Sequence, residues 1–144
     1  MIEQDTIRLL RECDSGVKMG ISSIEEVLDY VKSDKLKNYL IDSKHKHESL
    51  TREIQELLDS YQDEGKNPNP IIKGMSYIKT KAELVMNESD RTIASLMTDG
   101  CNMGVKSLSK SLNEYEAASE KSKDIAKRLI NIEETLAINI REFL

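Results

Sequence analysis

The chain has few of the residues that build β-sheets, tight turns or cross-linked folds. Among its 144 residues there is no tryptophan, one phenylalanine, two prolines, six glycines and two cysteines. The scarcity of aromatic residues disfavours sheets, and two cysteines are too few for a disulfide framework or a zinc site. The charged fraction is 33% and the hydrophobic fraction 38%. This mixture, rich in Lys, Glu, Leu, Ile and Ser, is typical of a single α-helical domain.

Long apolar runs and a basic stripe are also missing. No apolar run approaches the ~20 residues that a membrane helix needs. The 26 acidic and 21 basic residues give a net charge of −5 and are interspersed along the chain. No basic stripe exists that would follow a phosphate backbone, so we expect neither nucleic acid nor a membrane as a partner. The first five residues lack the cationic start and apolar run of a signal peptide, which predicts a cytoplasmic protein.

Apolar residues recur at helical spacing over four long segments and one shorter segment. We expect long helices over about 5–31, 35–63, 91–115 and 119–143, and a short helix over 71–86. Ser33 is an N-cap candidate, and both prolines lie in the break at 64–70. The last helix is expected to face inward with Leu129, Ile132 and Leu136. One domain over 1–144 is predicted, with hairpins at 5–63 and 91–144 and a crossover at 64–90. A single long connection predicts an all-α, ferritin-like four-helix bundle.

A six-residue pattern occurs twice, 84 residues apart. The segment 16–21 reads Gly-Val-Lys-Met-Gly-Ile and the segment 100–105 reads Gly-Cys-Asn-Met-Gly-Val. The offset carries the first long helix onto the third, so we predict two hairpins related by a pseudo-twofold axis. An interior glycine costs a helix about 1 kcal/mol relative to alanine. We therefore interpret four glycines as notches where the first and third long helices approach closely, with space for a ligand or a partner's side chain as the alternative: Gly16, Gly20, Gly100 and Gly104.

The segment from Ile7 to Lys18 resembles the opening of the PA2169-like four-helix-bundle proteins, a ferritin-like bacterial family of unknown function. That opening has a leucine-rich start, then Cys, a charged residue and Asp-Gly. A second similarity lies at 98–102, where the family tends to have Glu-Arg-Gly-Glu-Asp and this chain has Thr-Asp-Gly-Cys-Asn. The resemblance extends from about residue 5 to residue 144 and implies a ferritin-like fold in a bacterial, cytoplasmic and stress-related setting. It supplies no reaction.

The chain departs from that family pattern at acidic positions beside both glycines. The family's aspartate before the first glycine is Ser15 here, and its acids around the second glycine are Thr98, Cys101 and Asn102. A function carried by those acids would be absent from this protein. We interpret Cys101, and Cys13 near the first glycine pair, as buried thiols that act as small hydrophobic side chains.

A ferritin-like bundle raises the question of a di-iron site. Such a site uses a Glu from each of two helices and Glu-x-x-His from each of the other two. The nearest candidate is Asp42 with His45, near Glu48. Its acid is the shorter aspartate, His45 faces away from the apolar stripe, and the last helix has no histidine. We expect no cofactor and no enzymatic activity, and residual metal binding through these three residues stays an alternative.

Two polar residues interrupt the apolar stripes. His47 is expected to lie level with Gly20, where the missing side chain makes room for an imidazole. It is either a structural histidine bonded to a backbone carbonyl or hydroxyl, or a pH-sensitive or ligand-contacting group. Asp14 must be hydrogen-bonded, paired or close to water, and the hydroxyls of Ser15 and Thr98 are candidate partners. Asp14, His47 and Thr98 are therefore candidates for a ligand site or for a buried polar site.

The sequence predicts a non-catalytic helical bundle that serves as a structural or interaction module. A metal-binding relative of ferritin and a small-ligand carrier are the alternatives. The short segment at 71–86 carries more apolar surface than a connection needs, so we expect a homodimer or a protein partner. Its apolar residues are Ile71, Ile72, Met75, Ile78, Ala82, Leu84 and Val85.

Overall fold

The computed structural model describes residues 2–66 and 89–144, which form four long helices. These are α1 (Ile2–Leu28), α2 (Asp34–Ser60), α4 (Asp90–Glu114) and α5 (Glu120–Asn139), and a 3₁₀ turn, η1 (Ile140–Phe143), follows α5. The protein is an all-α four-helix bundle, as the sequence predicts, and most helix ends lie within about three residues of the expected positions. The short helix expected over 71–86 lies outside the described residues. None of the described helices is long and apolar enough to cross a membrane.

In the described part of the chain, α2, α4 and α5 each begin at a serine. The side chains of Ser33, Ser89 and Ser119 each accept a hydrogen bond from the backbone N–H three residues later. This satisfies one of the amide groups that a helix start leaves without an intrahelical partner. The N-cap predicted at Ser33 is confirmed, and the other two serines mark the starts of the second hairpin's helices.

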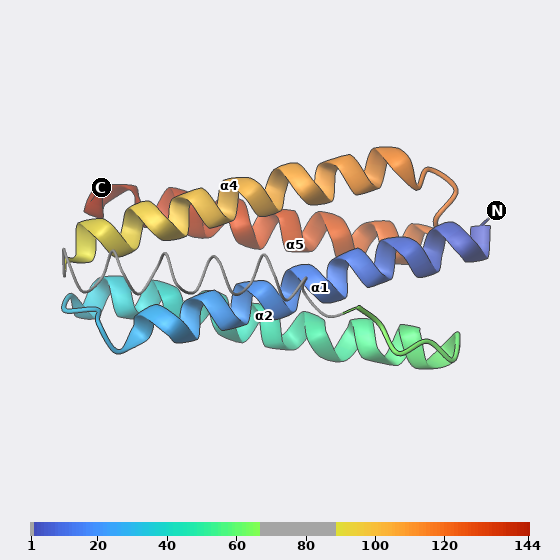
Figure 1. Cartoon of the computed structure of the whole chain (residues 1–144), viewed down its shortest axis with the longest axis horizontal. Helices are drawn as coiled ribbons and strands as arrows, with labels where there is room; N and C mark the ends of the chain where they lie inside the picture. The colour runs from blue at the N-terminus through green and yellow to red at the C-terminus, as the bar shows by residue number, and fades with distance from the viewer. Residues whose placement is uncertain (1, 67–88) are drawn as a thin grey trace.

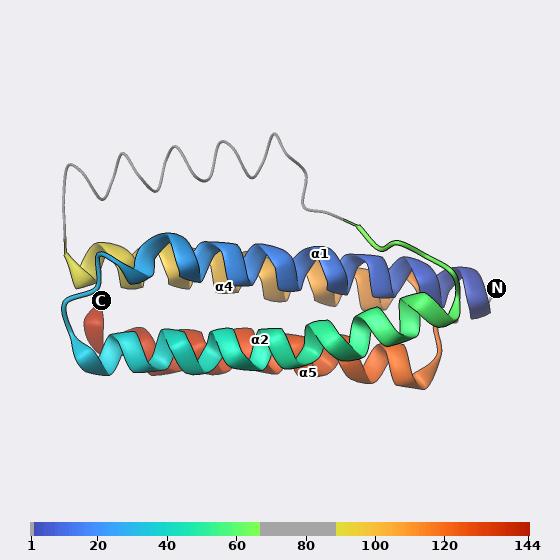
Figure 2. The same cartoon turned by 90° about the horizontal axis from the view of Figure 1, so that it is seen from below.

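The helices form two antiparallel hairpins, α1 with α2 and α4 with α5 (Figure 1). α2 and α4 run in the same direction, so one connection must run along the length of the bundle (Figure 1). The chain is therefore a four-helix bundle with one long crossover connection. α1 lies beside α4 and α2 lies beside α5 (Figure 2), and α1 also contacts α5 across the interior.

The core is divided into two apolar clusters along the bundle. One gathers around Leu10, Ile54 and Leu129, and the other around Ile24 and Leu36. Between the buried residues of the two clusters, each helix has at least one position without an apolar side chain. These positions include Gly20 in α1, His47 in α2, Gly104 in α4 and Glu133 in α5.

The pattern of buried residues repeats between the two hairpins. Every buried residue of α4 lies 84 positions after a buried residue of α1. Apart from Ile125, every buried residue of α5 lies 86 positions after a buried residue of α2. The offset grows by two because α4 extends two residues further than α1 before a connection of equal length. The repeat supports the predicted pseudo-twofold axis.

Candidate functional site

A buried histidine–glutamate pair lies at the centre of the bundle. His47 Nε2 is 2.6 Å from Glu133 Oε1, and His47 Nδ1 is 2.7 Å from the carbonyl oxygen of Ser43. The side chains of His47 and Glu133 are 1% and 11% exposed. The interpretation of His47 as a buried residue bonded to a backbone carbonyl is confirmed. The pair joins the first hairpin to the second.

The geometry fixes how many protons the pair holds. A carbonyl oxygen only accepts hydrogen bonds, so Nδ1 of His47 must donate to Ser43. The contact between Nε2 and Glu133 then needs one further proton, carried by either group. Burial lowers the pKa of His47, but the hydrogen bond and charge of Glu133, together with the Ser43 carbonyl, give a net raised pKa.

A glycine lies opposite each member of the pair, and Gly20 makes room for His47. A Cβ atom at Gly20 would lie 2.5 Å from His47 Nε2, and one at Gly104 would lie 3.6 Å from Glu133 Oε2. The placement of Gly20 opposite His47 is therefore confirmed. Both glycines face the polar pair that separates the two apolar clusters.

The glycines are not notches between α1 and α4. A Cβ atom at Gly16 would contact Leu129 of α5 at 3.5 Å, and one at Gly100 would have no atom within 4 Å. The interpretation as a close approach of the first and third long helices is wrong. Gly16 and Gly20 point toward side chains that enter from α5 and α2, and Gly100 lies on the exposed side of α4.

The two cysteines are buried thiols, and each belongs to a different apolar cluster: Cys13 to the one around Leu10 and Cys101 to the one around Ile24. Burial, followed by the charge of Glu133 and a hydrogen bond to it, raises the pKa of Cys101. Burial, with smaller effects from Glu12 and Asp14, raises the pKa of Cys13 to about 12. A thiol with a raised pKa stays protonated at neutral pH and is a poor nucleophile.

Asp14 forms a second buried polar site, where the chain leaves α2. Its Oδ2 accepts a hydrogen bond from Lys18 Nζ at 2.8 Å and from the backbone N–H of Lys66 at 2.9 Å. The hydroxyls of Ser15 and Thr98, predicted as its partners, do not bind it. Its partners are instead Lys18, one turn further along α1, and the backbone of the turn after α2, which folds back along α1.

Two ion pairs hold the same turn against α1. Arg11 binds Asp63, which lowers the pKa of that carboxyl group, and Glu12 binds Lys66 at 2.7 Å. Gly65 adopts φ = 84°, in the left-handed region that favours glycine, and a side chain there would overlap the carboxylate of Asp14. The end of the first hairpin is therefore fastened to α1 as far as Lys66.

The structure does not bring the predicted ligand-site residues together. Asp14 and His47 have separate partners, and the buried Oγ1 of Thr98 has no hydrogen bond within the described chain. The residues suggested for metal binding are all exposed on α2: Asp42, which pairs with Lys46, His45 and Glu48. Across residues 2–66 and 89–144, no three His, Cys, Asp or Glu residues are placed to hold a metal ion.

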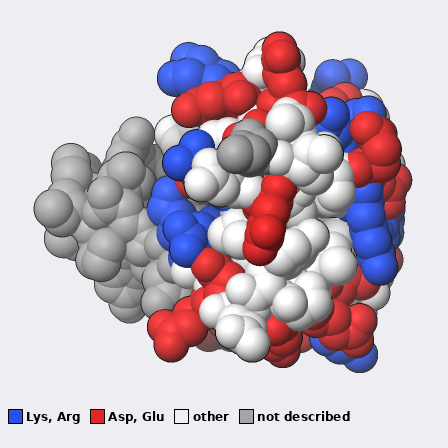
Figure 3. Space-filling view, turned by 90° about the vertical axis from the view of Figure 1, so that its right-hand side faces the viewer, with Lys and Arg blue, Asp and Glu red and all other residues white. Residues whose placement is uncertain are grey.

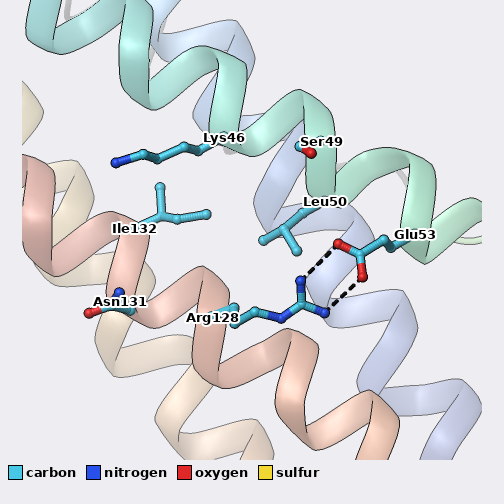
Figure 4. Close-up of a pocket in the computed structure, with 7 residues that line it drawn as sticks. All are labelled: Lys46, Ser49, Leu50, Glu53, Arg128, Asn131 and Ile132. Atoms are coloured by element: carbon cyan, nitrogen blue, oxygen red, sulfur yellow. Dashed lines mark hydrogen bonds and ion pairs between the residues drawn. The ribbon is translucent and has the colours of Figure 1, made fainter.

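A shallow groove of about 260 Å³ lies between α2 and α5 (Figure 4). Arg128 binds both carboxylate oxygens of Glu53 at 2.8 Å across one end of the groove. None of the predicted ligand-site residues lines it. Its lining consists of Lys46, Ser49, Leu50, Glu53, Arg128, Asn131 and Ile132.

Glu133 is the residue of the central pair that the sequence did not predict. The sequence predicts that Ile132 faces inward, but Ile132 is half-buried while Glu133 is buried. The distance from the serine N-caps could have identified Glu133 as the residue equivalent to His47. His47 lies fourteen residues after Ser33, and Glu133 lies fourteen residues after Ser119.

These features define a class of protein, an all-α bundle of two hairpins with a polar pair in its core. No family model and no curated protein matches the chain. It is similar to the crystal structure of a DUF305 fragment from Deinococcus radiodurans, with a TM-score of 0.75 and 11% identity, over 96% of this chain and 93% of that chain. At this identity the likeness shows a shared helical fold. The resemblance to the PA2169-like family stays a prediction.

Proposed function

We propose that the protein is a non-catalytic helical module that acts by associating with a protein chain, in the first place with a second copy of itself. The observation that carries this proposal is that His47 and Asp14, two buried polar residues, already have hydrogen-bond partners within the chain. Both ring nitrogens of His47 are engaged, one by Ser43 and the other by Glu133. The buried carboxylate of Asp14 is likewise held by Lys18 and Lys66. The buried titratable side chains therefore bind other groups of the same chain. This leaves the outer surface for recognition of a partner.

The outer surface carries both signs of charge. Seen from the end that bears the N-terminus, acidic and basic side chains lie beside one another around the bundle (Figure 3). Large exposed apolar side chains in the described chain are few and are Ile2, Met103, Ile138 and Leu144. The apolar residues that motivate a dimer interface lie at 71–85, outside the described residues, so this part of the proposal rests on the sequence alone.

The setting of the protein is part of the same proposal. The similarity of residues 7–18 and 98–102 to the PA2169-like family supports a bacterial, cytoplasmic and stress-related role, which we extend to this chain. The absence of the family's acids at Ser15 and Cys101 favours a role that does not depend on them.

Light scattering on the purified chain at micromolar concentration tests the proposal. We expect a dimer, and Met75→Asp should weaken it more than Met97→Ala, because Met97 is buried in the core of the bundle. A monomer throughout the concentration range would contradict the proposed self-association. Elemental analysis of protein purified without chelators covers the metal-binding alternative, which stoichiometric iron or manganese would favour instead.

A further inference from the structure

We infer that the His47–Glu133 pair makes the two hairpins complementary to each other and not to themselves, so that a second copy of this chain is bound by reciprocal exchange of hairpins. This inference rests on the homodimer proposed above and names the surface involved. That surface is the inner face of each hairpin.

The positions of the pair carry the argument. His47 and Glu133 lie equally far from the serine caps of their helices, and Gly20 and Gly104 lie opposite them, 84 residues apart. Two copies of the first hairpin, packed as the two hairpins pack here, would bring His47 against His47. Two copies of the second hairpin would bring Glu133 against Glu133. Buried like groups without a partner of opposite charge disfavour both arrangements, whereas the mixed arrangement satisfies both side chains.

Hydrogen bonds at the two ends of the bundle also join the hairpins. The backbone N–H of Ser119 donates to Thr6 Oγ1 at 2.8 Å, and the backbone N–H of Ser33 donates to Asp90 at 2.9 Å. Thr6 and Asp90 are equivalent under the repeat, and so are the two serines. Each of these bonds joins one hairpin to the other, but two like hairpins would make the same bonds, so the choice between like and unlike hairpins depends on the His47–Glu133 pair. All of them would form equally well between hairpins of different chains.

The connections determine which unit is exchanged. Each hairpin is closed by a connection of five residues, at 29–33 and 115–119, so its two helices belong to one chain. The bonds of Asp14 and Arg11 hold the first hairpin together as far as Lys66. The 22 residues from 67 to 88 remain. They can span up to about 75 Å when extended, whereas the 27 residues of α1 make a helix of about 40 Å. A chain of this length permits hairpins to be exchanged between two bundles, a route to dimers that needs no new interface.

Complementary variants test the inference. In a monomer, His47→Glu places two glutamates in contact and Glu133→His places two histidines in contact. Each substitution should lower Tm by roughly 10–20 °C. When the two variants are unfolded and refolded together, exchange yields one bundle with the native pair and one with the pair reversed. We expect a 1:1 heterodimer whose Tm lies within a few degrees of the wild type. A mixture that melts as the sum of its two separate components would overturn the inference.

The chain that carries both substitutions is the matched control. Its reversed pair forms within one molecule, where Gly104 lies beside position 133. If that chain does not fold, the mixture should still form a heterodimer, with one intact bundle that holds the native pair. A wild-type dimer without any rescue on mixing would overturn hairpin exchange and leave self-association through another surface standing. A wild-type monomer with rescue on mixing would support the exchange and contradict the proposed function.

Discussion

His47 and Glu133 occupy equivalent positions in the two hairpins, and their side chains bind each other 2.6 Å apart at the centre of the bundle. The contact therefore lies where the two halves of the repeat meet, between two apolar clusters. A buried polar pair of this kind often contributes less to stability than an apolar contact, but it strongly disfavours arrangements that leave one partner alone. We regard it as the feature that aligns the hairpins.

Gly20 and Gly100 should respond in opposite ways to the same substitution. Gly20→Ala places a Cβ 2.5 Å from His47 Nε2 and should lower the free energy of unfolding by about 1–3 kcal/mol. A Cβ atom at Gly100 has no other atom within 4 Å. Gly100→Ala should therefore raise the free energy of unfolding by up to about 1 kcal/mol, because alanine favours the helix. Urea denaturation measures both changes. Equal effects at the two sites would show that Gly20 does not make room for the imidazole.

The stability of the protein should decrease as the pH rises above neutrality. The net effect of Glu133 and Ser43 raises the pKa of His47 in the folded state. A raised pKa contributes stability that is fully present below the unfolded value of about 6.5 and is lost as the pH passes the folded value. Loss of the shared proton leaves Nε2 and the Glu133 carboxylate as two acceptors in contact.

Unfolding curves between pH 6 and pH 9.5 measure this dependence. His47→Gln is the control, because an amide donates a hydrogen bond without titrating, and its profile should be flatter than that of the wild type. Parallel profiles for the two proteins would mean that the pair does not bind a proton more tightly on folding.

Asp14 should control how firmly the end of the first hairpin is held. Asp14→Ala removes the acceptor of the Lys66 backbone N–H and should cost about 1–3 kcal/mol. Hydrogen exchange at the Lys66 amide should accelerate by at least about tenfold. Asp42→Ala, which removes an exposed pair with Lys46, is the control and should leave that amide unchanged. Equal protection of Lys66 in both variants would contradict the role of Asp14.

The sequence predicts the parts of this structure that depend on local pattern. Helical spacing and the serine cap at Ser33 predict the long helices, and the placement of the one long connection predicts the order of the hairpins. The sequence also predicts that His47 lies beside Gly20, because an antiparallel hairpin with a short turn fixes which residues lie level. The helices, the caps and the position of His47 can be predicted from the sequence of one hairpin without reference to the other.

The rest depends on contacts between distant segments. Glu133 and Ile132 are adjacent, and which of them faces inward is decided by the helices that surround α5. One of the two partners of Asp14 is a backbone amide 52 residues away in a turn, where no side-chain pattern marks it. The outward direction of Gly100 likewise follows from the rotation of α4 in the bundle, although its sequence repeats that of Gly16.

A double-mutant cycle at His47 and Glu133 tests the central claim most directly. The variants His47→Ala, Glu133→Ala and the double variant are compared by urea denaturation, with the exposed Glu53–Arg128 pair as a second cycle. Each single change at the central pair should cost about 3–5 kcal/mol, because it leaves a buried polar group alone. The double variant should lose at least about 2 kcal/mol less than the sum of the two, whereas the coupling at the exposed pair should stay below about 1 kcal/mol. A coupling within about 0.5 kcal/mol of zero at the central pair would contradict the account, because the two side chains would then be neighbours that do not depend on each other.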